Sequence, residues 1–308
     1  MKLITLIEHE SARLEQSGVS FGHGTTNAFD EAVWLALWRL GLPLDDLDGV
    51  AERHLSPEEI QAVTTLTDER IARRTPAAYL TGEAWLQGVP FHVDPRTIVP
   101  RSLIAECLAE GLIDALLGRE PETVLDLCTG NGSLAILSAM AWPDSTVTGT
   151  DLSADALAVA ELNRQRHQLA HRLSLQHGDG LAPLAGCRYD LILCNPPYVN
   201  AQSMQALPDE FRAEPEIALH GGSDGMDFIR PLIAQARGHL SPDGWLVLEI
   251  GHERPYFEAA FPMLEPLWIE TSAGEDLVLA LPAQALPEPS EMAQPPMKSA
   301  NPHPPIGS

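Results

Sequence analysis

The chain has 308 residues, of which 44% are hydrophobic, and its 19 basic and 43 acidic residues give a formal net charge of −24. This length suits one large domain or two small ones, and no apolar run is long enough to span a bilayer. The acidic charge disfavours unaided binding to DNA or RNA and favours basic partners, although a generic adaptation for solubility explains it equally well. Without a recognisable leader peptide, we expect a cytoplasmic protein with no membrane association.

The first part of the chain is predicted to be helical. Asn27 opens one amphipathic segment, and the capping box Ser56-Pro57-Glu58-Glu59 begins another helix. We therefore expect a small helical domain over residues 1–77. Residues 78–101 form a linker, in which the stretch from Trp85 to Val93 predicts a β-hairpin with its turn near Gln87-Gly88.

Strands and helices are predicted to alternate over residues 102–281, which is typical of right-handed βαβ units in a parallel sheet. The fold class is therefore α/β. Beyond the last strand the sequence is polar and rich in proline, so residues 282–308 are predicted to be a disordered tail. The expected strands cover 123–127, 146–150, 173–176, 189–194, 245–250 and 277–281, and the expected helices cover 133–141 and 154–168.

The link between the first strand and its helix is Asp126-Leu127-Cys128-Thr129-Gly130-Asn131-Gly132-Ser133. Its glycines permit a tight turn and a close approach of a ligand, and the helix that follows offers free N–H groups. Asp151 ends the next strand, about 20 residues later, where a carboxylate accepts hydrogen bonds from a ribose diol. This arrangement predicts a cofactor that contains a nucleoside.

Two cofactors fit this loop, a dinucleotide or S-adenosylmethionine. The full G-x-G-x-x-G fingerprint for a pyrophosphate is missing, because position 135 is an alanine. Asp126, ahead of the glycines, suits a ligand that carries an amino group and a sulfonium. Asp179 follows the third strand and can accept a hydrogen bond from an adenine amino group, although an ordinary loop aspartate is an equal alternative.

The tetrapeptide Asn195-Pro196-Pro197-Tyr198 follows an apolar strand, at the end where open α/β sheets bind ligands. The Asn195 side-chain carbonyl can accept one N–H of a planar amide or amine, and the Pro196 carbonyl can accept the other. The prolines fix the backbone before a ligand binds, and Tyr198 offers a flat face for stacking. Taken alone, the tetrapeptide is equally well explained as a strand that two prolines terminate.

The cofactor loop, Asp151 and the tetrapeptide stand in the order and spacing of S-adenosylmethionine-dependent amino-methyltransferases. The set closely resembles the protein-glutamine N(5)-methyltransferases of the HemK/PrmB group, over about residues 20 to 281. Further matching stretches cover residues 78–82, 99–102 and 214–225. The resemblance implies a Rossmann-like methyltransferase sheet over residues 102–281, joined by the hairpin to an N-terminal helical domain that recognises the substrate.

Within this group, residues 21–32 resemble the PrmB branch, whose members methylate a glutamine of the third large-subunit ribosomal protein. The branch that methylates the Gly-Gly-Gln glutamine of release factors lacks this stretch. The resemblance therefore implies a basic ribosomal protein as the partner and substrate, with a release factor as the alternative. Asn131 departs from the serine or threonine usual between the two glycines, at a position that acts mainly through its backbone.

The resemblance also implies the roles of individual residues. Asp151 binds the ribose hydroxyls, and Gly180 lies beside the adenine, near Asp179. Asn195 faces both cofactor and substrate, and no metal ligands are expected. The methionine end of S-adenosylmethionine is lined by Cys128, Thr129, Gly130, Asn131 and Gly132, next to Asp126. The substrate glutamine is held by Asn195, Pro196, Pro197 and Tyr198, of which Asn195, Pro196 and Tyr198 are the expected catalytic residues.

Two other functions are compatible with parts of this sequence. The same tetrapeptide can hold an exocyclic amine and stack a flipped base, as in nucleic-acid amino-methyltransferases. Such enzymes need a basic surface, which the excess of acidic residues disfavours. The second rival is an inactive cofactor-binding protein that acts in ribosome assembly, and the intact acids and tetrapeptide disfavour it.

Overall fold

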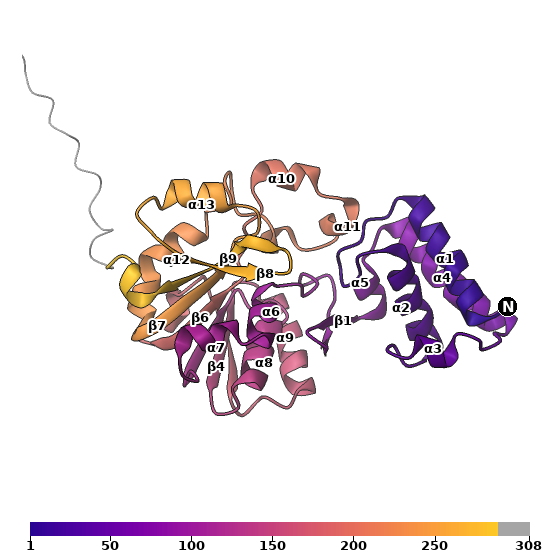
Figure 1. Ribbon diagram of the computed structural model, residues 1–308, viewed down its shortest axis with the longest axis horizontal. Coiled ribbons are helices and arrows are strands. Elements are labelled where there is room, and N and C mark those ends of the chain that lie inside the picture. The colour runs from indigo at the N-terminus through magenta and orange to yellow at the C-terminus, as the bar shows by residue number, and fades with distance from the viewer. Residues whose placement is uncertain (289–308) are drawn as a thin grey trace, which may run out of the picture.

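The structure, a computed structural model, describes residues 1–288. Helices α1 (Leu3–Ser17), α2 (Ala28–Leu40) and α4 (Pro57–Arg73) pack around an apolar core of their own (Figure 1). The Asn27 side chain caps α2, and Ser56 caps α4 through the expected capping box. The short helices α3 (Leu47–Val50) and α5 (Ala77–Thr81) complete this N-terminal part.

A β-hairpin follows, formed by β1 (Glu83–Leu86) and β2 (Val89–His92). Gln87 and Gly88 both have a positive φ, as the predicted two-residue turn requires. The buried Asn163 accepts a hydrogen bond from His92 N at 2.7 Å and donates to the His92 carbonyl at 2.9 Å. The same amide donates to the Asn131 carbonyl at 2.8 Å, so the hairpin is fastened to the predicted cofactor loop.

The central sheet has seven strands in the order β5-β4-β3-β6-β7-β9-β8, and β9 is antiparallel to both of its neighbours. The prediction of an α/β fold with a parallel sheet is confirmed for the five strands from β5 to β7 in this order. Strand β8 was not expected from the sequence. The strands are β3 (Thr123–Leu127), β4 (Thr146–Asp151), β5 (Leu173–His177), β6 (Tyr189–Cys194), β7 (Leu240–Glu249), β8 (Leu267–Thr271) and β9 (Gly274–Pro282).

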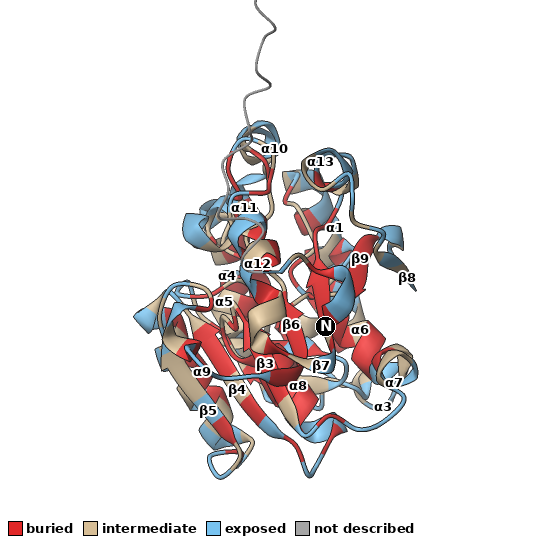
Figure 2. Ribbon diagram, turned by 90° about the vertical axis from the view of Figure 1, so that its left-hand side faces the viewer, coloured by how far each residue is buried: buried red, intermediate tan, exposed pale blue. Residues whose placement is uncertain are grey.

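Helices cover both faces of this sheet, which explains why its strands are apolar on both sides (Figures 1 and 2). One apolar core joins the sheet to α6 (Ile104–Ala109), α7 (Leu112–Leu117) and α8 (Ser133–Ala141), with α9 (Ala154–Arg166) beside α8. The other core joins it to α12 (Ile229–Ala236) and α13 (Arg254–Ala260). Between β6 and α12 lie α10 (Ala201–Ala206), α11 (Asp209–Arg212) and the 3₁₀ turn η2 (Glu216–Ala218).

The prediction of a disordered tail from residue 282 is wrong for its first residues. Strand β9 extends to Pro282, and the 3₁₀ turn η4 (Ala283–Ala285) leads to Leu286, which is 1% exposed. The Leu286 carbonyl accepts a hydrogen bond from Arg237 Nη1 at 2.9 Å. Apolar burial against the sheet outweighs the polar, proline-rich composition here. Residues 289–308 of the predicted tail lie outside the described residues, and in residues 1–288 no helix is long and apolar enough to cross a membrane.

Candidate active site

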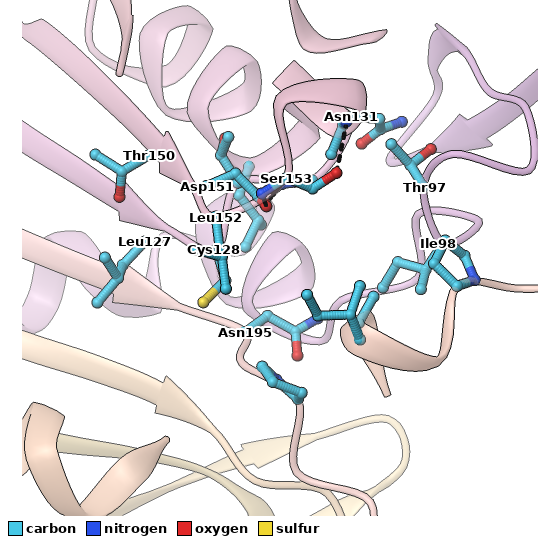
Figure 3. A pocket seen from close by; sticks show the side chains of 18 of the residues that line it. Thr97, Ile98, Leu127, Cys128, Asn131, Thr150, Asp151, Leu152, Ser153 and Asn195 are labelled. Atoms are coloured by element: carbon cyan, nitrogen blue, oxygen red, sulfur yellow. Dashed lines mark hydrogen bonds between the residues drawn. The ribbon is translucent and has the colours of Figure 1, made fainter. Parts of the chain in front are cut away.

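A cavity opens at the carboxyl ends of β3, β4 and β6 (Figure 3). The chain runs outward from β3 to β4 on one side and to β6 on the other, and open α/β sheets bind ligands at such a switch point. Most of the predicted site residues meet here although they come from four separate loops. Those that line the cavity are Cys128, Thr129, Gly130, Asn131, Asp151, Asp179, Gly180, Asn195 and Pro197.

The two glycines of the cofactor loop have different roles. Both have a positive φ, of 56° for Gly130 and 83° for Gly132. A Cβ on Gly130 would meet no atom within 4 Å, so this backbone faces open space in the cavity and can be approached closely by a ligand. A Cβ on Gly132 would lie 3.2 Å from the Ala160 Cβ. Gly132 therefore allows α8 to pack against α9 and is not part of the cavity wall.

Asp151, at the end of β4, holds the glycine loop in place. Its Oδ2 accepts a hydrogen bond from Gly130 N at 2.9 Å, and its Oδ1 accepts one from Ser153 N at 2.8 Å. Burial raises the pKa of this carboxyl above its usual range, and the backbone N–H groups partly oppose that shift. Each oxygen keeps a second lone pair for a ligand, so the carboxylate can accept from a vicinal diol in the cavity.

Asp126 lies behind the cavity wall and does not line it, which differs from the expected direct contact with the cofactor. Side chains alternate along β3, so Asp126 points toward α8. There its Oδ2 accepts from Thr129 Oγ1 at 2.5 Å and from Ala135 N at 2.9 Å. Burial raises the Asp126 pKa to about 7. The carboxyl joins the loop to the first turn of α8.

Three buried polar atoms on the cavity wall have no hydrogen-bond partner within residues 1–288: Thr97 Oγ1, Asn131 Nδ2 and Thr150 Oγ1. Buried polar groups are normally paired, so a polar ligand fits this wall. Leu152 and Phe228 add apolar surface suited to a flat ring. With the diol acceptor Asp151 and the open Gly130 backbone, this set of residues fits S-adenosylmethionine.

The tetrapeptide divides between the cavity and the core. Asn195 and Pro197 line the cavity, whereas Pro196 is buried. Tyr198 does not line the cavity, which differs from the expected stacking face. A Cβ on Gly251 would lie 2.5 Å from a Tyr198 ring atom, so the ring packs directly against this backbone. Tyr198 thus anchors the tetrapeptide to the strand beside it.

Glu249, the last residue of β7, is a positioning residue that the sequence reasoning missed. Its Oε2 accepts from Ser102 Oγ at 2.6 Å and from Leu103 N at 2.9 Å, and its Oε1 accepts from Tyr198 at 3.1 Å. Burial raises the Glu249 pKa. The carboxyl therefore joins the matching stretch 99–102 to the tetrapeptide. A carboxylate inside an apolar strand was the available signal, because such a group is buried only with partners.

The cavity wall also includes residues from two of the three further matching stretches. Arg101 belongs to the stretch 99–102, and Pro215, Ile217 and Ala218 belong to the stretch 214–225. Their position inside these stretches was the only sequence signal, because none of them carries a chemistry that the cofactor requires.

Comparisons with known proteins identify the family. Residues 106–222 match the methyltransferase small domain. The chain is 51% identical over 292 residues to the ribosomal protein uL3 glutamine methyltransferase of Burkholderia pseudomallei, covering 92% of this chain and 94% of that protein. It is 52% identical to the protein of the same name from Bordetella pertussis, over 91% and 95% of the two chains. The chain belongs to the uL3 glutamine methyltransferase family.

Membership of this family confirms the resemblance to the HemK/PrmB group and to its PrmB branch. It also confirms the expectation of a methyltransferase. The fold of this chain is similar to that of the hMettl16 catalytic domain in complex with MAT2A 3′UTR hairpin 6. The two agree with a TM-score of 0.50 at 15% identity, over 74% of this chain and 81% of that one, and this likeness concerns the fold alone.

Proposed function

We propose that this protein transfers a methyl group from S-adenosylmethionine to the side-chain amide nitrogen of a glutamine in ribosomal protein uL3. The observation that carries the proposal is the family itself, because relatives about half identical over nine tenths of the chain bear the name uL3 glutamine methyltransferase. The cavity supports it independently, since it combines a diol acceptor, Asp151, with an amide acceptor, Asn195.

S-adenosylmethionine supplies a methyl group activated by its sulfonium. Asp151 accepts from the ribose hydroxyls, and the backbone of residues 128–131 borders the methionine portion. Leu152 and Phe228 flank the adenine, and the exposed Asp179 accepts from its amino group. Asp126 does not contact the cofactor, but its hydrogen bonds hold the cofactor loop against α8.

Asn195 and the carbonyl of Pro196 orient the substrate amide. An amide nitrogen is a poor nucleophile, because its lone pair is delocalised into the carbonyl. Two acceptors that hold the NH₂ group direct this lone pair at the methyl carbon, and orientation of this kind lowers a barrier by up to about 7–11 kcal/mol. The acceptors also stabilise the partial positive charge that develops on nitrogen. The nitrogen–carbon bond forms as the sulfur–carbon bond breaks, and the methylated amide cation releases its proton to water without a strong general base.

The helical domain over residues 1–77 is assigned to recognition of the substrate protein. The net charge of −24 supports a basic partner, as expected for a ribosomal protein before it meets its RNA, and disfavours RNA itself as the substrate. Such a partner is available in the cytoplasm, where we place the reaction.

A transfer assay tests the substrate. The protein is incubated with methyl-labelled S-adenosylmethionine and, separately, with purified unassembled uL3, a release factor or ribosomal RNA. We expect label in uL3 and at most traces in the other two. Label in the release factor alone would move the chain to the alternative glutamine substrate, and label in RNA would refute a protein substrate.

A further inference from the structure

The segment 207–218, which includes α11 and η2, lies between the N-terminal helices and the part of the chain that forms the sheet (Figure 1). Its last residues, Pro215, Ile217 and Ala218, form part of the cavity wall. Two acidic residues of the same segment, Glu210 and Glu214, are 0% and 4% exposed. A buried carboxylate is stable only with partners, and each of these finds them outside its own segment.

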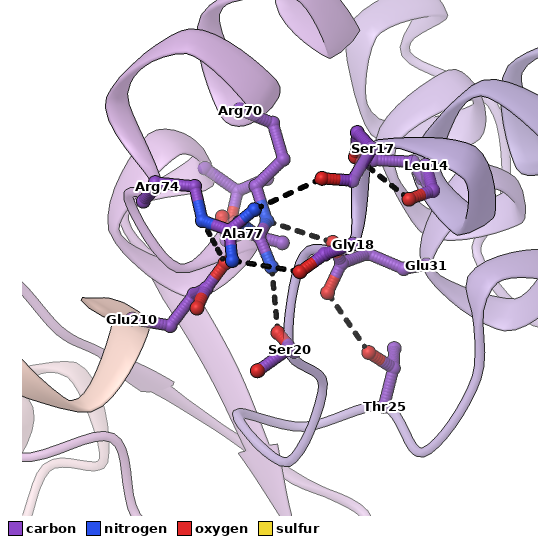
Figure 4. Close-up of polar contacts among 11 residues, drawn as sticks. Leu14, Ser17, Gly18, Ser20, Thr25, Glu31, Arg70, Arg74, Ala77 and Glu210 are labelled. Atoms are coloured by element: carbon purple, nitrogen blue, oxygen red, sulfur yellow. Dashed lines mark hydrogen bonds and ion pairs between the residues drawn. The ribbon is translucent and has the colours of Figure 1, made fainter. Parts of the chain in front are cut away.

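Glu210 is bound by arginines of the N-terminal part (Figure 4). Arg70, in α4, donates to Glu210 Oε1 at 3.1 Å and to Glu31 Oε1 at 2.8 Å, and all three side chains are about 1% exposed or less. Arg74 Nε forms an ion pair with the same Glu210 oxygen at 3.0 Å. Arg70 also donates to the Ser20 carbonyl at 2.8 Å, which fixes the guanidinium relative to the helices.

Glu214 is bound by the stretch 99–101 and lies next to His23. Arg101 donates to both carboxylate oxygens, at 2.6 and 2.7 Å, and Val99 N donates to Oε1 at 2.8 Å. His23 Nε2 lies 3.6 Å from Oε1, an electrostatic contact too long for a hydrogen bond. Burial opposes ionisation, but His23 and the Arg101 guanidinium outweigh it and lower the Glu214 pKa to about 2.

Phe211 joins the two carboxylate sites. Its ring centroid lies 4.3 Å from that of His23 on one side and 5.4 Å from the Arg101 guanidinium carbon on the other. A Cβ on Gly22 would lie 3.4 Å from the Phe211 ring, so the backbone at Gly22 closely approaches it. The segment 207–218 is thus held at three successive points, Glu210, Phe211 and Glu214, and residues of the N-terminal part contact each of them.

We propose that Arg70 and Arg74 are positioning residues for the cofactor cavity, which act through Glu210. The residues that line the cavity begin at Arg96, so the N-terminal helices do not touch a ligand bound there. Their docked position nevertheless fixes the segment whose end forms the cavity wall. Undocking takes both arginines away from Glu210, which frees the segment and removes Pro215, Ile217 and Ala218 from the wall. Contact of a substrate protein with the N-terminal domain is thereby coupled to the affinity for the cofactor.

Arg74→Gln tests this coupling, because Arg74 is half-buried whereas Arg70 is fully buried. The substitution also removes donors to the Ser17 and Gly18 carbonyls, at 3.2 and 2.7 Å, which join Arg74 to the end of α1. Glu210→Gln is the second variant, as it keeps the shape of the side chain and removes its charge. The control is Arg73→Gln, because Arg73 lies next in the chain but pairs with Glu69 on the surface, where it is 70% exposed. Affinity for S-adenosylmethionine is measured by calorimetry, and amide hydrogen exchange is followed over residues 207–218.

We expect both test variants to weaken S-adenosylmethionine binding at least about fivefold, the lower end of typical coupling between sites, and to speed exchange over residues 207–218. The control should match the wild type in both measurements. Unchanged affinity for S-adenosylmethionine in a folded variant would refute the coupling. A lower melting temperature alone would not support it, because loss of a cluster that only stabilises the fold lowers the melting temperature and leaves the affinity unchanged. Weakened affinity without faster exchange over 207–218 would also refute it.

The inference rests on the proposed function only in that the cavity takes S-adenosylmethionine. Failure of the wild type to bind this cofactor would contradict the proposed function. Equal binding by the wild type and Arg74→Gln would contradict the coupling alone, so the two failures are distinguishable.

Discussion

The Tyr198 hydroxyl donates a hydrogen bond to Glu249 Oε1, 3.1 Å away, and this bond ties the tetrapeptide to the end of β7. The other Glu249 oxygen accepts from Ser102, so one buried carboxyl fixes the two chain segments that flank the cavity. Asn195 and Pro197 are thereby positioned at the cavity wall by Tyr198 and Glu249, which do not line the wall themselves. The tyrosine of the tetrapeptide is a support for the amide acceptors.

Tyr198→Phe tests this support. The ring still packs against Gly251, but the hydroxyl is lost and Glu249 Oε1 is left without that donor. We expect the free energy of unfolding to fall by about 1–3 kcal/mol, the cost of an unsatisfied buried acceptor, with cofactor affinity unchanged. Urea denaturation and calorimetric titration measure the two quantities. Full stability together with weakened binding of the substrate protein would instead indicate that Tyr198 touches the substrate.

Asn195→Ala tests the amide acceptor. Removal of one of two groups that orient the substrate NH₂ should lower kcat about a hundredfold, as for other groups that act mainly in the transition state. Binding of S-adenosylmethionine should be nearly intact, because Asp151 and the backbone of the loop remain. Gln202→Ala, an exposed replacement in the neighbouring α10, is the matched control. A wild-type kcat in the Asn195→Ala variant would show that Asn195 does not orient the substrate amide.

Asp151→Ala tests the ribose acceptor. A hydrogen bond to a charged group contributes about 1.5–3 kcal/mol, so loss of the carboxylate should weaken S-adenosylmethionine binding about tenfold or more. Gly130 N also loses its acceptor, which adds disorder in the loop. Asp155→Ala, at an exposed position four residues along the chain, should bind like the wild type. Calorimetric titration with S-adenosylmethionine compares the wild type and the two variants. Equal affinities in all three proteins would exclude Asp151 as the ribose acceptor.

The pKa of Asp126 gives stability a pH dependence. Burial raises this pKa to about 7, so between about pH 4 and 7 the folded state retains a proton that the unfolded state has lost. The free energy of unfolding should therefore fall as pH rises through this window, by up to roughly 4 kcal/mol, and be level above it. Asp126→Asn keeps an acceptor for Thr129 and Ala135 and removes the titration. Urea denaturation from pH 4.5 to 8 compares the two proteins, and parallel curves would contradict the raised pKa.

Local patterns predicted the elements that position the cofactor. The strand 123–127, the helix 133–141 and the hairpin turn at Gln87-Gly88 follow directly from apolar runs, glycines and turn residues, and the structure has them at the expected places. Strand β8 was not predicted, because it has only five residues and just two of them, Ile269 and Thr271, are buried. Its apolar pattern is therefore weak. The order of residues 282–286 was not predicted, because a polar, proline-rich composition does not indicate that Leu286 is buried in the core.

The site was predictable where one loop carries its own chemistry, as at Gly130, Asp151 and Asn195. The site was not predictable where a contact with a residue distant in the sequence determines which way a side chain points. Tyr198 turns to Glu249, 51 residues away, and Glu210 pairs with Arg70, 140 residues away. Nothing within either segment indicates its partner, because buried charges are matched by the tertiary fold and not by local sequence.

The proposed methyl acceptor is the side-chain nitrogen of a glutamine in uL3. Fragmentation mass spectrometry of unassembled uL3 after reaction with S-adenosylmethionine locates the methyl group most directly. We predict a single methyl group on one glutamine side chain, formed about a hundredfold more slowly when Asn195→Ala replaces the wild type. A methyl group on a lysine, an arginine or the backbone, or the same modified glutamine formed at the wild-type rate by Asn195→Ala, would contradict this assignment.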